Sequence, residues 1–175
     1  TALGLIHERL IKTEDAINAY SRIQGNGPFK KRLAVLYLQK NELEKGLEQF
    51  LEYEQIQGDD YTARVKIGLI YFELKQYAKA KDKFQTILKE QPDADNVRFY
   101  MGWVCEELKE WDRALSEFKK VTKDSTLFKE AMLHVGYILR ENNRLKEGTE
   151  FSKKLLAKHA EVTEFYDLHA SFYEA

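Results

Sequence analysis

The sequence predicts an all-α protein built from stacked helical hairpins, and three observations lead to this prediction. Proline occurs only twice and glycine nine times among 175 residues, so little in the chain interrupts helices. Small residues recur at intervals of 34, at Gly68, Gly102, Gly136 and Ala170, and Ala34 precedes them in the same register. A fixed period of this length in a helix-rich chain is typical of helical repeat arrays, which usually present binding surfaces.

The first two predicted units cover residues 1–26 and 27–60. The first unit is partial and should contain one helix without its first turn, followed by the whole of a second helix. Its residues in register are Leu3, Gly4, His7, Ala16, Tyr20 and Ile23. The second unit is complete, and Pro28 is well placed at its helix start. Its residues in register are Leu33, Ala34, Tyr37, Leu43, Gly46, Phe50 and Tyr53.

Residues 61–94 carry the pattern most clearly. The first helix should hold a large, a small and an aromatic residue, and the second should begin near Tyr77 and end before Pro92. The pattern residues are Ile67, Gly68, Tyr71, Ala80, Phe84 and Ile87. Small residues are expected where two helices approach most closely, because a bulky side chain would push the helices apart. This need outweighs the cost of about 1 kcal/mol for glycine within a helix.

Residues 95–128 and 129–162 repeat the pattern with substitutions. In the first of these units Cys105 takes the aromatic position, and the other pattern residues are Met101, Gly102, Trp111, Ala114, Phe118 and Val121. In the second unit Ser152 stands where an aromatic residue is expected, and we expect Phe151 beside it to compensate. The other pattern residues there are Val135, Gly136, Leu139, Leu145, Gly148 and Leu155.

Residues 163–175 supply one further partial unit, a single helix. Terminal repeats need a polar cap, and neither end of this chain resembles one. The last helix is therefore expected to expose Phe165, Tyr166, Leu168, Phe172 and Tyr173. We accordingly expect the chain to be a fragment of a longer array, or its ends to meet another copy of the chain.

The order of large, small and aromatic residues, followed by a second helix and a closing proline, resembles the tetratricopeptide repeat family. The resemblance covers the whole chain as four full repeats flanked by two partial ones. It implies a right-handed α-solenoid of antiparallel helix hairpins, forming a single array over residues 1–175. It also implies a non-enzymatic scaffold for protein–protein interaction.

The resemblance places the first helix of each repeat along a concave groove. Register with the family gives a set of groove residues in which rigid aromatic side chains could anchor a partner. The set is Lys31, Lys66, Phe72, Phe99, Tyr100, Trp103, His134 and Tyr137. We expect the groove to bind a peptide or an amphipathic helix of a partner protein. The alternative is that Trp103 and Tyr137 pack in the core.

The same register predicts that the charge of the groove changes along the chain. Basic residues come early, at Lys31, Arg32 and Lys66, and acidic residues come later, at Glu106, Glu107, Glu130, Glu141, Glu164 and Asp167. Such a gradient could orient a partner. The alternative is an ordinary solvated face. His134 could make binding depend on pH, or could simply face solvent.

Catalytic, metal-binding and cofactor-binding patterns are missing from the sequence. His7-Glu8 does not continue to a second histidine, so the zinc-protease motif fails. The single cysteine, Cys105, cannot form an internal disulfide and falls at a helix-packing position, where an inert thiol is expected. We therefore expect no enzyme activity, no metal and no cofactor.

Composition limits the remaining classes of function. The 28 Lys and Arg residues nearly balance the 29 Asp and Glu residues, so nucleic-acid binding is not expected. No apolar run approaches the roughly 18 residues of a membrane-spanning helix, so membrane insertion is not expected either. A soluble protein is expected, with the cytoplasm slightly favoured over the cell envelope or periplasm. Two alternatives to a partner-binding groove remain: a self-assembly module that stacks through its terminal repeats, and a regulatory array attached to a catalytic domain outside this sequence.

Overall fold

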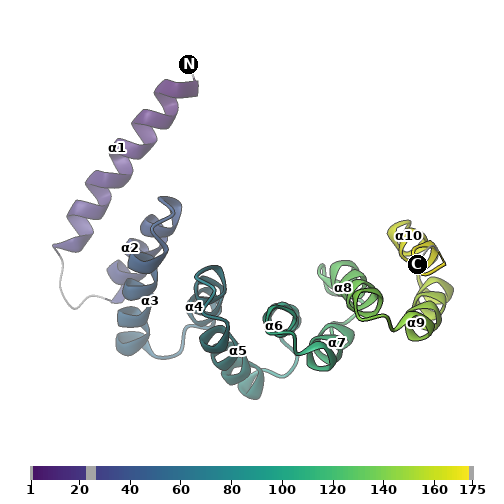
Figure 1. Cartoon of the computed structure of the whole chain (residues 1–175). Helices are drawn as coiled ribbons and strands as arrows, with labels where there is room; N and C mark the ends of the chain where they lie inside the picture. The colour runs from purple at the N-terminus through teal and green to yellow at the C-terminus, as the bar shows by residue number, and fades with distance from the viewer. Residues whose placement is uncertain (1, 23–26, 174–175) are drawn as a thin grey trace. The chain divides into compact units, whose positions relative to one another are not determined.

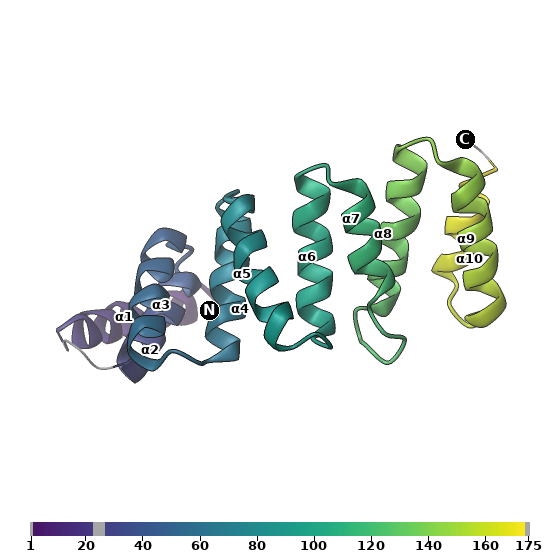
Figure 2. The same cartoon turned by 90° about the horizontal axis from the view of Figure 1, so that it is seen from below.

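The computed structural model describes residues 2–22 and 27–173, with side chains described from residue 12 onward in these ranges. Within this part of the chain every regular element is a helix, which confirms the all-α prediction, and the helices from α2 to α9 pair in succession as antiparallel hairpins (Figures 1 and 2). The helices are α1 (Ala2–Ser21), α2 (Gly27–Gln39), α3 (Leu43–Gln57), α4 (Tyr61–Glu73), α5 (Tyr77–Glu90), α6 (Asp95–Glu107), α7 (Trp111–Lys119), α8 (Phe128–Glu141), α9 (Leu145–Lys158) and α10 (Glu164–Ala170).

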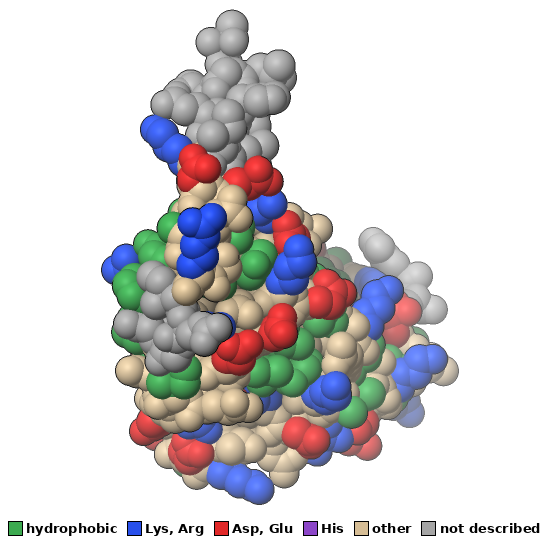
Figure 3. Space-filling model, turned by 90° about the vertical axis from the view of Figure 1, so that its left-hand side faces the viewer, with side chains coloured by type: hydrophobic (Ala, Val, Ile, Leu, Met, Phe, Trp, Pro, Cys, Tyr) green, Lys and Arg blue, Asp and Glu red, His purple; other side chains and the backbone are tan. Residues whose placement is uncertain are grey.

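The chain forms two compact units, residues 1–83 (unit 1) and residues 84–175 (unit 2), and the boundary falls within α5. Helices α2, α3 and α4 build the core of unit 1. The buried residues of that core are Ala34, Leu47, Phe50, Tyr53, Ala63, Ile67 and Ile70. The end face of unit 1, shown in Figure 3, mixes acidic and basic side chains with apolar ones.

Four hairpins reverse the chain in the same way, through three-residue connections. The middle residue of each connection has a left-handed backbone, with φ of 60° at Asn41, 57° at Lys75, 58° at Lys109 and 56° at Asn143. The next amide bonds back to a carbonyl five residues earlier, as from Gln76 to Tyr71 at 2.8 Å. This Schellman arrangement satisfies carbonyls that the end of a helix would otherwise leave unpaired.

Small residues mark close helix approaches, as predicted from the sequence. A Cβ atom added at Gly102 in α6 would lie 2.6 Å from the ring of Phe118 in α7, and one at Gly46 in α3 would lie 2.7 Å from Leu38 in α2. Gly136 differs, because its close neighbour is Leu168 of α10 rather than a residue of α9. A glycine in this register can therefore admit the following helix instead of its own hairpin partner.

The prediction that the last helix exposes its apolar side chains is wrong for three of the five residues. Phe165, Leu168 and Phe172 are buried, and only Tyr166 (51% exposed) and Tyr173 (71% exposed) remain as large exposed residues of this segment. Leu168 packs against Gly136 of α8, and Phe172 packs against Gly148 of α9. The short helix therefore buries its apolar face on the preceding hairpin.

The same helix provides one polar neighbour of Ser152, which is fully buried in α9. The Ser152 hydroxyl lies 2.8 Å from Nδ1 of His169 and 2.8 Å from the Gly148 carbonyl oxygen. Phe151, which was expected to compensate, instead lies beneath the ammonium of Lys119, at 5.7 Å from its ring centroid. At the position where an aromatic residue is expected, the structure therefore has a buried serine whose hydroxyl is hydrogen-bonded to polar partners.

The amino-terminal segment also differs from prediction, because Ala2–Ser21 is one continuous helix rather than a hairpin. Residues 8–15 contain no Gly, Pro or Asn, so the sequence between the two expected helices favours continuation. The predicted packing positions at Leu3, Gly4, His7 and Ile23 lie outside the residues whose side chains are described.

A polar network connects α2, α3 and α4 of unit 1. Asp60 is the N-cap of α4 and accepts the Ala63 amide at 3.0 Å. It also accepts from the Lys31 ammonium of α2 at 2.5 Å and from the Tyr53 hydroxyl of α3 at 2.8 Å. The Lys31 ammonium is the largest influence, and together with the amide and the hydroxyl it lowers the pKa of Asp60 to about 2, against the opposing effect of desolvation.

We predict that Lys75→Gly stabilises the protein by about 0.5–1 kcal/mol, because a left-handed backbone strains a lysine and not a glycine. Urea denaturation of the variant and the parent protein measures the difference. Lys153→Gly is the matched control, since Lys153 is exposed within α9; there the same replacement should destabilise by about 1 kcal/mol. Destabilisation by both replacements would contradict the left-handed turn.

We predict that Asp60→Asn destabilises the protein by about 1–2 kcal/mol at pH 6, and that the difference from the parent protein narrows as the pH falls toward 2. The folded pKa lies below the unfolded one, so the carboxylate stabilises the fold above about pH 4 and loses this effect as it becomes protonated. Urea denaturation at several pH values provides the measurement.

Asp59→Asn is the control for this prediction, because Asp59 is 95% exposed on its side chain and has only a 3.5 Å contact with Arg64. Its effect should stay within about 0.5 kcal/mol across the same pH range. A difference between Asp60→Asn and the parent protein that does not change with pH would show that the charge of Asp60 contributes nothing.

Candidate functional site

The structure places five of the eight predicted groove residues in unit 2, on α6 and α8. Phe99, Tyr100 and Trp103 come from α6, and His134 and Tyr137 come from α8. Phe99 and Trp103 are four residues apart, and His134 and Tyr137 are three apart, so each pair shares a helix face. The remaining three, Lys31, Lys66 and Phe72, belong to unit 1.

The five residues of unit 2 differ in how far their side chains are exposed to solvent. Trp103 is 37% exposed and Tyr137 is 44% exposed, so these two rings can meet a partner. Phe99 is only 4% exposed and packs edge-on against Phe118 at 5.6 Å, which makes it a core residue. Tyr100 is half-buried, with its ring 5.8 Å from Phe84. We call Trp103 and Tyr137 the exposed aromatic pair.

A hydrogen-bonded chain fixes the orientation of Trp103. Its indole N–H donates to Nε2 of His134 at 3.0 Å, and Nδ1 of His134 lies 2.9 Å from Oε2 of Glu106. Because Nε2 accepts, Nδ1 carries the proton and donates to the carboxylate. The imidazole also stacks on Phe118, with ring centroids 4.9 Å apart. His134 is therefore a support for Trp103 and links α6 to α8.

A pocket of about 450 Å³ opens beside Tyr137. It is formed by the ends of α6 and α8, by the connections that follow them, and by the first residue of α7. Its lining residues are Glu106, Glu107, Lys109, Trp111, Tyr137, Ile138, Glu141 and Asn142. The repeat register predicted Glu106, Glu107 and Glu141 to lie in the groove, whereas Trp111 was predicted only as a residue of the repeat pattern.

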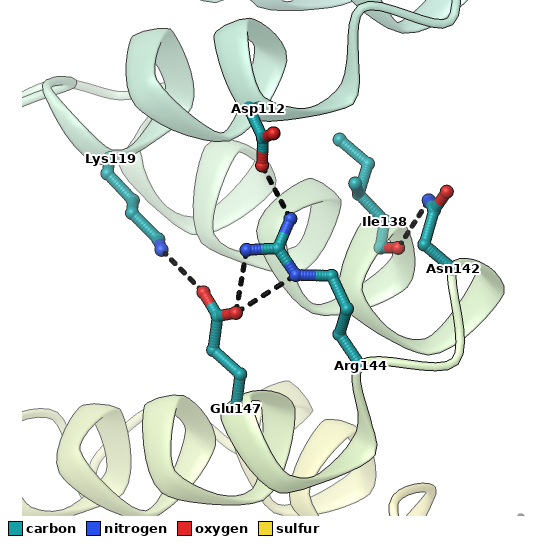
Figure 4. A network of polar contacts seen from close by, with 6 residues as sticks. All are labelled: Asp112, Lys119, Ile138, Asn142, Arg144 and Glu147. Atoms are coloured by element: carbon teal, nitrogen blue, oxygen red, sulfur yellow. Dashed lines mark hydrogen bonds and ion pairs between the residues drawn. The ribbon is translucent and has the colours of Figure 1, made fainter.

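Polar contacts around Arg144 join α7 to the beginning of α9, as Figure 4 shows. The Arg144 guanidinium donates to Asp112 at 2.7 Å and to Glu147 at 2.7 Å, and Lys119 reaches Glu147 at 3.5 Å. The bond with Asp112, followed by that with Glu147, raises the pKa of Arg144. In the same view Asn142 donates to the Ile138 carbonyl at 2.8 Å, which closes α8 at the wall of the pocket.

The predicted residues of unit 1 have other surroundings. Lys31 is bound in the Asp60 network, so its charge is already balanced within the protein. Phe72 is half-buried, with its ring 5.4 Å from that of Tyr77, and Lys66 is also half-buried. Of these three residues, Lys31 therefore has a structural role that the sequence register did not reveal.

Within the described residues, no group of three or more His, Cys, Asp or Glu side chains is arranged to hold a metal ion. Among the described helices, none combines the length and the apolar character needed to cross a membrane. Cys105 is buried and is not part of a disulfide. The exposed aromatic pair and the neighbouring pocket together form the candidate site of unit 2.

Known families and solved structures include proteins with the same fold as this chain. Residues 62–94 match the sequence model of the tetratricopeptide repeat. No curated protein sequence matches the chain. A crystal structure of MamA is similar over 88% of this chain and 92% of that chain, at 18% identity and a TM-score of 0.74.

Two further solved structures share the arrangement of helices. MamA 41-end from Desulfovibrio magneticus RS-1 aligns over 90% of this chain and 93% of that chain, at 12% identity and a TM-score of 0.73. YrrB, described as a TPR protein with an unusual peptide-binding site, aligns over 93% of this chain and 84% of that chain, at 19% identity and a TM-score of 0.67. At these identities the likeness shows a shared fold. Residues 62–94 therefore match a tetratricopeptide repeat, and the chain shares the fold of YrrB, a structure described as a TPR protein.

Proposed function

We propose that this chain is a non-enzymatic scaffold that binds a segment of a partner protein at the exposed aromatic pair. The observation that carries the proposal is that Trp103 and Tyr137 stay exposed although their neighbours on α6 and α8 are buried. Aromatic side chains provide large contact areas and lose little conformational entropy on binding, which is why they dominate protein interfaces.

The support beneath Trp103 favours binding over mere exposure. The indole is held by His134, which is held in turn by Glu106 and Phe118. A ring that is already fixed in the free protein loses less freedom when a partner binds. An extended peptide or an amphipathic helix suits such a surface, because each can present apolar side chains at regular intervals. YrrB, a protein of the same fold, is described as having a peptide-binding site, which is consistent with the proposal.

Self-assembly through the last helix has less support than the sequence suggested. The prediction depended on two uncapped ends, and at the C-terminal one Phe165, Leu168 and Phe172 are buried within unit 2. Two tyrosines, Tyr166 and Tyr173, remain exposed. The proposed partner is therefore a different protein that binds at α6 and α8.

We predict that the double replacement Trp103→Ser and Tyr137→Ser removes captured partners in a quantitative pull-down from the source cell, by tenfold or more, since two interface anchors of this kind contribute about 2 kcal/mol each. Phe99 is left intact because it is a core residue. Circular dichroism and thermal unfolding must first show that the variant remains folded.

Tyr166→Ser is the matched control, because it removes an exposed aromatic residue of α10 outside the proposed surface. It should leave capture unchanged. A photo-crosslinking residue at position 137 should join the captured protein to α8. Equal capture by the double variant and the parent protein, with both folded, would reject the exposed aromatic pair as the binding surface.

A further inference from the structure

The pocket beside Tyr137 is large enough to admit a long side chain. Its volume of about 450 Å³ lies at the lower end of the range for small-ligand pockets. Helix α6 ends at Glu107 and α8 ends at Glu141, so two helix C-termini meet at the pocket, against the single N-terminus of α7 at Trp111. Helix C-termini carry partial negative charge, which favours a cation.

The side chains reinforce this preference. Three carboxylates line the pocket, from Glu106, Glu107 and Glu141, and one ammonium, from Lys109. Glu141 is 3.6 Å from Arg140 and its side chain is largely exposed, whereas Glu106 is held by His134. The whole chain has a net charge of only −1, so the excess of acid in the pocket is a local property.

Two aromatic side chains, Trp111 and Tyr137, complete the lining. The guanidinium carbon of Arg140 already lies 5.6 Å from the centre of the Tyr137 ring, so this ring accepts a guanidinium on one side. A planar guanidinium can stack on an aromatic ring and also donate paired hydrogen bonds to carboxylates. An ammonium meets carboxylates as a point charge and stacks less well.

We propose that this pocket receives an arginine side chain from the partner segment that binds at the exposed aromatic pair. The inference rests on the proposed function, because the arginine belongs to the partner segment proposed there. Tyr137 belongs to both features and joins them into one surface. The arginine would set the position of the segment along α6 and α8, while the aromatic pair supplies most of the contact area.

The test uses N-acetyl-arginine amide as the probe, added to the isotope-labelled chain and followed by amide and indole NMR shifts. Saturable shifts are expected at residues 106–111 and 137–142 and at the Trp111 indole. N-acetyl-citrulline amide has almost the same shape without the charge and should give no saturable shift. N-acetyl-lysine amide should bind about threefold more weakly. The arginine shifts should weaken as salt is added.

Variants test the assignment to the carboxylates. Glu107→Gln and Glu141→Gln should each weaken arginine binding by about threefold, as expected for partly exposed ion pairs. Glu130→Gln removes the same charge from the exposed start of α8, outside the pocket, and should have no effect. Equal shifts with citrulline, unchanged binding in both pocket variants, or no shift up to about 50 mM probe would overturn the proposal.

The outcomes also separate this inference from the proposed function. Capture that depends on Trp103 and Tyr137, without any arginine effect, would reject the arginine pocket and leave the scaffold proposal standing. Saturable arginine binding, with capture unaffected by the aromatic replacements, would reject the exposed aromatic pair and keep the pocket as a cation site.

Discussion

The reversal of the chain after the first helix of each hairpin is the constraint on which the rest of this structure depends. Each reversal uses three residues, places the middle one in a left-handed conformation, and returns a backbone hydrogen bond to the helix just ended. Since the four left-handed positions are 34 residues apart, every second helix starts at the same point of the repeat. The packing of Gly102 against Phe118 follows from that fixed start.

The same reversals also build the pocket. Lys109 is the left-handed residue after α6, Glu107 ends that helix, and Trp111 begins α7. Asn142 stands in the corresponding connection after α8. A feature required for folding thus brings two helix C-termini, the negative ends of their helix dipoles, to one pocket. The acidic side chains add to a field that the backbone already creates.

The periodic residues predicted the fold well because the small residues and the buried aromatics obey a local rule of packing. Phe50, Phe84 and Phe118 recur in register and are fully buried. The turns were harder to predict, because Lys75 and Lys109 occupy left-handed positions that usually hold glycine or asparagine. The burial of Phe165 depends on whether α10 folds back on α8 and α9, which its own sequence does not determine.

The candidate site shows a similar limit of sequence reasoning. The repeat register placed Phe99 and Trp103 on one helix face. In the structure the ring of Phe118 packs against Phe99, which is buried, whereas Trp103 stays exposed. Lys31 matched a groove position, whereas Asp60 and Tyr53 hold it in unit 1. The pocket combines three helices, so no single repeat reveals it.

In the proposed function, the exposed aromatic pair and the pocket of unit 2 meet two different requirements of recognition. A rigid aromatic surface supplies contact area at low entropic cost, yet it discriminates poorly between apolar segments. Adjacent carboxylates discriminate by charge, although in solvent they contribute little affinity by themselves. Glu106 takes part in both, because it orients His134 beneath Trp103 and also lines the pocket. A partner that neutralised Glu106 would therefore act on the support of Trp103, so the two parts of the surface are coupled through one carboxylate.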